Sequence, residues 1–124
     1  MVGVPPVGTW SSDHTPTVVT GELRIRRFRV AEDSMRPALA PGDTLLTISD
    51  ADPPIGSIVV FRHPTVPDRW LVKRVSAVSG GEAWVESDDS EATMADSRTL
   101  GWVPTHGMHR VVLRFRSPFS WARP

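Results

Sequence analysis

Two side chains in this sequence have the clearest potential for chemistry, the hydroxyl of Ser34 and the amine of Lys73. A serine hydroxyl becomes a good nucleophile when a neighbouring base takes its proton, and a neutral lysine amine can be that base without a histidine. The chain has no cysteine, which excludes a thiol nucleophile, a disulfide framework and a thiolate zinc site. Catalysis by this chain would therefore use oxygen or nitrogen groups.

Lys73 lies within residues 70–78, a run that is typical of a β-strand. Successive strand residues face opposite sides, so Leu71, Lys73 and Val75 share one face. Burial between apolar neighbours penalises the ammonium form and lowers the pKa of a lysine, as a general base near neutral pH requires. The same pattern also fits a lysine that extends from a strand edge into solvent. The pattern alone leaves both interpretations open.

Ser34 comes directly before residues 35–39, which could form one short helical turn. A serine in that place commonly caps the helix by accepting a backbone hydrogen bond. The local pattern therefore fits a structural cap as well as a nucleophile.

The elements that must position these two residues are predicted to be mostly β. Runs of β-type residues alternate with turns that contain Pro or Gly, and no window shows a sustained apolar stripe of helical period. The twelve prolines would also interrupt most candidate helices. We expect a single compact domain of short antiparallel strands, at residues 23–30, 44–49, 57–62, 70–78, 83–86 and 108–116.

The chain divides into two parts by composition. Residues 1–21 are rich in Pro, Gly, Ser and Thr without periodicity, which predicts a disordered N-terminal arm. The folded domain is then expected to span residues 22–124, the size of one ordinary domain.

Charge and hydropathy argue against several classes of partner. Fourteen basic side chains balance fourteen acidic ones, so no net field favours nucleic acid or an anionic membrane. The longest apolar runs are far shorter than the roughly 18 residues of a membrane span. The first twenty residues lack the apolar core of a secretory signal. We expect a cytoplasmic protein with no nucleic-acid partner and no membrane span.

Neither a metal nor another cofactor is expected. His106 and His109 would point to opposite sides of a strand, and no third ligand lies at a supporting spacing. Asp88, Asp89 and Glu91 lack the glycine and the spaced ligands of a calcium-binding loop. A solvated acidic turn is the better interpretation of that segment.

Three segments, in this order along the chain, resemble the sequence boxes of the signal peptidase I and LexA-like family of Ser/Lys peptidases. Residues 32–43 (EDSMRPALAPGD) resemble the nucleophile box. Residues 56–62 (GSIVVFR) and 71–75 (LVKRV) resemble the box that holds the general-base lysine. Residues 95–104 (ADSRTLGWVP) resemble the third box, whose Asp and Arg brace the site.

The resemblance implies a soluble serine endopeptidase with a LexA/signal-peptidase-like β domain. Ser34 would be the nucleophile, Lys73 the general base, and the backbone N–H of Ser34 a donor to the oxyanion. The resemblance also implies that Asp96 and Arg98, together with Arg74, brace the site. Asp96 and Arg98 lie two residues apart, so an ordinary surface ion pair remains the alternative.

The substrate is expected to be an extended peptide that lies between the strand leading to Ser34 and the strand that carries Lys73. Its side chains would be read by shallow pockets, so small residues are expected next to the cut. The expected groove residues are Asp33, Met35, Leu71 and Val72.

The length and the closing strand most resemble the branch described as nickel-type superoxide dismutase maturation protease. That resemblance implies removal of an N-terminal leader from the dismutase precursor, which would be the partner. The alternatives are signal-peptidase-like processing of another precursor and a non-catalytic peptide-binding β module. A LexA-like self-cleaving regulator is disfavoured, because the arm is too short for a DNA-binding helix-turn-helix.

Two positions depart from the family pattern. Glu32 stands where family members often have a hydroxyl residue that helps to hold the oxyanion. Met94 stands where they often have a serine near the lysine. These departures keep the non-catalytic alternative open, and the sequence assigns no contacts to Phe119 and Trp121 near the C-terminus.

Overall fold

The computed structural model describes residues 6–7, 18–20, 23–31, 33–89, 96–116 and 120–122. Within these residues the secondary structure is almost entirely β, with one short helix, α1 (Ser97–Leu100). The strands are β1 (Pro6–Val7), β2 (Val18–Thr20), β3 (Leu23–Val30), β4 (Thr44–Ser49), β5 (Ile58–Arg62), β6 (Trp70–Ser79), β7 (Glu82–Glu86), β8 (Val103–Pro104), β9 (His109–Arg116) and β10 (Ser120–Ala122).

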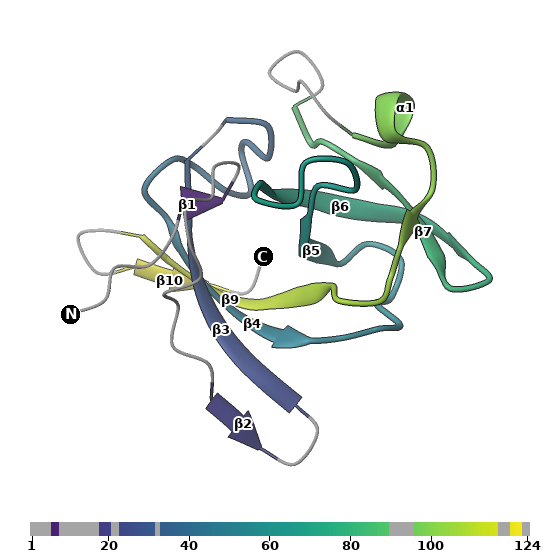
Figure 1. Cartoon of the computed structure of the whole chain (residues 1–124). Helices are drawn as coiled ribbons and strands as arrows, with labels where there is room; N and C mark the ends of the chain where they lie inside the picture. The colour runs from purple at the N-terminus through teal and green to yellow at the C-terminus, as the bar shows by residue number, and fades with distance from the viewer. Residues whose placement is uncertain are drawn as a thin grey trace.

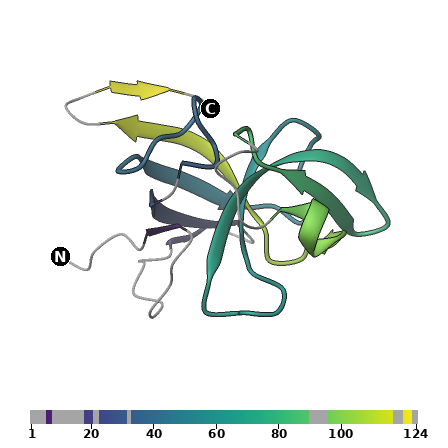
Figure 2. The ribbon, with the colours of Figure 1, turned by 90° about the horizontal axis from the view of Figure 1, so that it is seen from above.

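These strands pair into one sheet in the order β1-β3-β4-β9-β5-β6-β7-β8, while β2 also pairs with β3 and β10 with β9. Every pair is antiparallel except β1 with β3, which is parallel. The sheet is strongly bent, so β5, β6 and β7 lie across from β3, β4 and β9 (Figures 1 and 2). The prediction of a single, mostly β domain of short antiparallel strands is confirmed.

The six strands expected from the sequence are all present, and their bounds differ from the expected ones by at most one residue. The helix α1 and the short strand β8 were not predicted. The helix begins because the Asp96 side chain accepts a hydrogen bond from the Arg98 backbone N–H as its N-cap. It ends at Gly101, whose positive φ of 71° turns the chain away.

The N-terminal arm, residues 1–21, contributes the two described strands β1 and β2, both of which pair with β3. Pro6 and Val7 lie opposite Arg29 and Val30, close to the end of β3. The division of the chain into a disordered arm and a peptidase domain stays a prediction.

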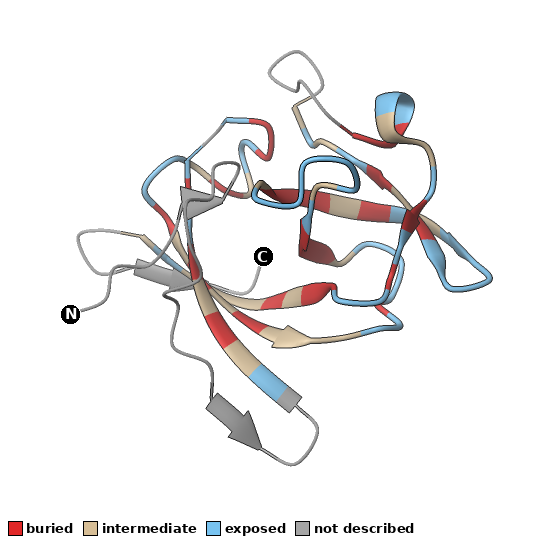
Figure 3. Cartoon of the chain, in the orientation of Figure 1, coloured by how far each residue is buried: buried red, intermediate tan, exposed pale blue. Residues whose placement is uncertain are grey.

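Two apolar clusters cover the two faces of β5 and β6, which explains why these strands are apolar in succession rather than alternating. Figure 3 shows the buried stretches on β5 and on the first half of β6. The first cluster contains Phe28, Val30, Met35, Leu39, Leu45, Ile58, Val60, Trp70, Val72 and Val111. The second contains Val59, Phe61, Leu71, Val75, Ala83, Val85, Val103 and Met108.

No helix in the described ranges is both long enough and apolar enough to cross a membrane.

Candidate active site

The structure brings Ser34 and Lys73 together, although 39 residues separate them in the chain. Lys73 Nζ lies 3.1 Å from Ser34 Oγ, a distance typical of a hydrogen bond. Both residues are buried, with 1% of Ser34 and 2% of Lys73 exposed. The burial of Lys73 decides against the interpretation in which its amine extends into solvent.

Ser34 is held by the turn that follows β3. The backbone N–H of Leu39 bonds to the carbonyl of Met35 at 2.8 Å, so the expected helical turn is present as a single turn. Met35 and Leu39 are fully buried in the first cluster and anchor this turn against the sheet. The chain then returns through Gly42, whose φ of 92° is costly for a residue with a Cβ.

Lys73 lies in a stretch of β6 whose apolar side chains pack into both clusters. Leu71 and Val75, on the same face of β6, belong to the second apolar cluster, while Val72 belongs to the first. Val59 on β5 lies opposite Lys73 in the sheet. The amine therefore contacts Ser34 within a buried and packed surrounding.

A second hydroxyl, that of Ser87, accepts a hydrogen bond from Lys73 Nζ at 2.9 Å. The family resemblance predicts such a group at position 94, and Met94 lies outside the described residues. Ser87 directly follows β7, where Glu86 pairs with Arg74, so the register of the sheet continues to Ser87 opposite Lys73. A β-bulge between Val75 and Ala77 shifts this register, which a count from the Gly80–Gly81 turn alone would miss.

Residues 87–89 bridge the nucleophile segment and the lysine strand. The backbone N–H of Asp89 bonds to the Ser34 carbonyl at 2.8 Å, and the N–H of Asp88 approaches the Met35 sulfur at 3.4 Å. With the Ser87 contact to Lys73, three consecutive residues thus touch the groups on both sides of the candidate site. The sequence pattern predicts only a solvated acidic turn in this segment, and these contacts correct that prediction for residues 87–89.

Arg74 fixes the same bridge from the opposite face of β6. Its guanidinium makes two hydrogen bonds to the Asp88 carboxylate, at 2.8 and 2.9 Å, and one to the Gly56 carbonyl at 2.7 Å. The hydrogen bonds that Arg74 donates to the Asp88 carboxylate raise the pKa of Arg74 above its ordinary value. Arg74 is therefore placed to orient Asp88 rather than to touch Ser34.

Asp96 connects α1 to the bridge. Its carboxylate is 2% exposed and accepts hydrogen bonds from the Arg98 guanidinium and backbone N–H, both at 2.9 Å, with a longer one from the Ser87 N–H at 3.4 Å. Burial alone would raise the pKa of Asp96, but these hydrogen bonds outweigh it and hold the pKa below its usual value. The pair is thus half buried, unlike an ordinary surface ion pair.

The depressed pKa of Asp96 predicts how the protein responds to acid. A carboxyl whose folded-state pKa lies below the unfolded value stabilises the fold above pH 3.8, and this stabilisation is lost as the pH falls through the folded-state pKa. Asp96→Asn is therefore expected to lower the melting temperature at pH 7. It should also make the melting temperature decrease less as the pH is lowered below 4, and both effects are measured by circular dichroism.

The control for this prediction is Asp68→Asn, which changes an exposed carboxyl and should melt like the wild type at every pH. Some acid dependence should remain in Asp96→Asn, because the pKa of Asp43 is also lowered by its hydrogen bonds from Arg116 and Ala40 despite its burial. Equal melting curves for Asp96→Asn and the wild type across this range would contradict the assignment.

The expected groove residues differ in exposure. Asp33 is exposed and pairs with Arg36, while Leu71 and Val72 are buried on opposite faces of β6. Met35 is fully buried in the core. Their contact with substrate stays a prediction, as does the role of the Ser34 backbone N–H. Glu32 lies outside the described residues, and so do the side chains of Phe119 and Trp121.

The structure thus shows a small β protein in which a buried serine hydroxyl and a buried lysine amine are in hydrogen-bonding contact. A profile of the family described as signal peptidase, peptidase S26, matches residues 16–89, a range that includes both Ser34 and Lys73. The match covers more than half of the chain, and the chain belongs to this family of serine peptidases. Comparisons with curated proteins and with solved structures gave no match.

Proposed function

We propose that the protein is a serine endopeptidase in which Ser34 is the nucleophile and Lys73 is its general base. The observation that carries this proposal is the 3.1 Å contact between the two side chains inside a buried, packed site. Family membership supports the peptidase activity, and the contact supports the assignment of the two roles.

In this mechanism the neutral Lys73 amine takes the proton of Ser34 Oγ as that oxygen attacks the scissile carbonyl. The tetrahedral intermediate places its negative charge near the Ser34 backbone N–H. Lys73 then gives the proton to the leaving amine, and an acyl-enzyme remains on Ser34. A water molecule, deprotonated by Lys73, attacks this ester and releases the acid product and free Ser34.

Ser87 is a positioning residue in this scheme. Its hydroxyl accepts a hydrogen bond from Lys73 Nζ, which leaves the lone pair of the neutral amine available to the Ser34 hydroxyl. Asp96 acts through Ser87, and Arg74 acts through Asp88, to keep residues 87–89 in place. Arg98 supports Asp96 in turn.

The substrate we propose is the N-terminal leader of a precursor protein, with the nickel-type superoxide dismutase precursor as the specific candidate. An extended leader would pair with the edge of β3 that leads to Ser34. The chain's own β1 supports this geometry, because it pairs with β3 in an extended form and lies against β6. We infer a cytoplasmic location, and a peptidase domain of residues 22–124, from the sequence features described above.

The experiment that tests this function mixes the purified chain with a leader-bearing dismutase precursor and, separately, with a precursor that carries a secretory signal peptide. Mass spectrometry of the products should show one cut, which frees the mature N-terminus of the dismutase. Cleavage of the second precursor alone would refute the dismutase assignment and leave the peptidase. Cleavage of neither would favour the non-catalytic peptide-binding module.

A further inference from the structure

The loop that joins β5 to β6, residues 63–69, is organised around the ring of His63. The backbone N–H groups of Thr65 and Val66 both donate hydrogen bonds to His63 Nδ1, each at 3.1 Å. The Thr65 hydroxyl lies 3.3 Å from the same nitrogen. One ring nitrogen therefore holds the first turn of the loop, in the way that an Asp or Asn side-chain oxygen holds an Asx-turn.

Two backbone hydrogen bonds complete the loop behind this turn. The N–H of His63 bonds to the carbonyl of Arg69 at 2.7 Å, and the N–H of Arg69 bonds to the carbonyl of Val66 at 2.9 Å. Residues 64–68 are all exposed. Because a loop with few buried apolar contacts opens at a low cost in free energy, its hydrogen bonds decide whether it stays closed.

The bonding pattern at Nδ1 requires a neutral ring. A neutral imidazole has one nitrogen that accepts and one that donates, whereas both nitrogens of a charged imidazole donate. Since Nδ1 of His63 accepts from two N–H groups, we assign the proton of the neutral ring to Nε2. A second proton, on Nδ1, would turn the acceptor into a donor that faces two other donors. The closed loop is therefore compatible with the neutral ring alone.

The surroundings of the ring also favour its neutral form. Burial, and after it the charge of Arg69, lower the pKa of His63 below the ordinary value of 6.5. The other charged or titratable groups of the hairpin and of the adjoining pocket are Arg62, Asp68, Arg26, His106 and His109. All of these except Asp68 are cations or become cations in acid, which further disfavours a charge on the His63 ring.

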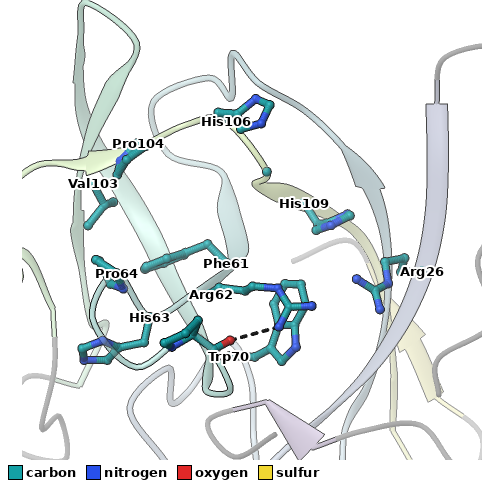
Figure 4. A pocket seen from close by; sticks show the side chains of 12 residues that line it. Arg26, Phe61, Arg62, His63, Pro64, Trp70, Val103, Pro104, His106 and His109 are labelled. Carbon is teal, nitrogen blue, oxygen red and sulfur yellow. Dashed lines mark hydrogen bonds between the residues drawn. The ribbon is translucent and has the colours of Figure 1, made fainter. Parts of the chain in front are cut away.

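The loop forms one wall of the adjoining pocket, which has a volume of about 510 Å³. Figure 4 shows His63 on the side of this pocket opposite Arg26 and His109. The Arg62 guanidinium donates a hydrogen bond of 3.0 Å to the carbonyl of Pro67, and the dashed line in Figure 4 marks it. The conformation of the loop therefore sets the shape of this side of the pocket.

We propose that His63 is a pH-sensitive lock on the β5–β6 loop, which is closed while the ring is neutral and opens when the ring takes a second proton. The pKa of the ring in the closed loop lies below the 6.5 expected in an open loop. The stabilisation of the closed loop is thus complete above pH 6.5, and it is lost as the pH falls through the pKa of the closed form. The lock does not depend on the serine–lysine pair.

The test follows the loop of the full chain by NMR between pH 8 and pH 4.5. We expect backbone order parameters of Thr65 and Val66 of about 0.85 at pH 8, falling to about 0.6 or less at pH 4.5. The order parameter of Val72, in β6, should stay at about 0.85, which shows that only the loop has opened. Nitrogen-15 spectra of the His63 ring should show the proton on Nε2 at pH 8 and protonation of Nδ1 along the same titration.

His63→Asn is the decisive variant. The Asn side-chain oxygen lies at the same place along the side chain as Nδ1, so it can accept from the same two N–H groups, and it does not titrate. Its loop should stay ordered at every pH. His63→Ala lacks the acceptor and should have a mobile loop at every pH. His106→Gln is the matched control, because it removes an exposed histidine of the same pocket and should titrate like the wild type.

Three results would each overturn the proposal. The first is a wild-type loop that keeps its order down to pH 4.5. The second is a His63→Asn loop that opens with pH as the wild type does, which would assign the effect to another group. The third is a neutral His63 ring with its proton on Nδ1. None of these measurements involves cleavage, so the outcome for the lock and the outcome for the peptidase are independent.

Discussion

Ser34→Ala is expected to lower the rate of leader cleavage by about 10⁴-fold or more, because it removes the atom that forms the acyl-enzyme. The protein should remain folded. The lost hydroxyl makes one hydrogen bond to Lys73, which keeps its bond to Ser87, so the free energy of unfolding should fall by only about 1 kcal/mol. Cleavage and thermal melting are measured on the same preparation.

Ser76→Ala is the matched control for this prediction, since Ser76 is an exposed serine of β6 that hydrogen-bonds to Trp84 and Glu86 rather than to the site. It should cleave like the wild type. A residual rate in Ser34→Ala above a few per cent of the wild-type rate would remove Ser34 from the role of nucleophile.

Lys73→Arg is expected to abolish cleavage, although arginine keeps the positive charge on a side chain of similar length. A guanidinium does not lose its proton at accessible pH and so cannot accept the proton of Ser34. A cation with a merely structural role would tolerate this change. Because a buried arginine can also disturb the packing, Lys73→Met is made beside it, and only variants with a cooperative melting transition are compared.

The pH profile provides the second part of this prediction. Only the neutral amine is a base, so the wild-type kcat/KM should rise with pH along one titration and then level off. Lys73 is 2% exposed beside Leu71 and Val75, so we expect the midpoint to lie below the 10.4 of free lysine. Ser87→Ala should cleave about 10- to 100-fold more slowly and still titrate. A flat profile from pH 6 to 10, or near-normal cleavage by Lys73→Arg, would contradict the base assignment.

The main strands could be predicted because their apolar and β-branched runs are separated by Pro and Gly turns. The short elements could not. α1 has only four residues and depends on a cap whose carboxylate is fixed from elsewhere in the fold. The strand β1 has only two residues, one of them a proline. Its position is set by backbone pairing with β3, and an apolar pattern in the sequence does not predict such pairing.

The candidate site could also be predicted only in part. The alternation along β6 indicated the face on which Lys73 lies. The burial of both faces of β6 depends on two apolar clusters that bring distant segments together. The contact of Ser87 with Lys73 could not be predicted, because a β-bulge in β6 shifts the register that places these two residues opposite each other. For Asp96 the sequence allowed a surface ion pair, and only the packing of α1 makes its carboxylate buried.

The parallel pairing of β1 with β3 has a consequence for any leader that uses the same edge. Pro6 and Val7 pair with Arg29 and Val30 along the edge of β3. A leader that pairs with the same residues must therefore displace β1 of the same molecule. A tethered segment competes at an effective concentration of about a millimolar, independent of how dilute the protein is. The apparent affinity for a leader is then its intrinsic affinity multiplied by the fraction of molecules whose β3 edge is open.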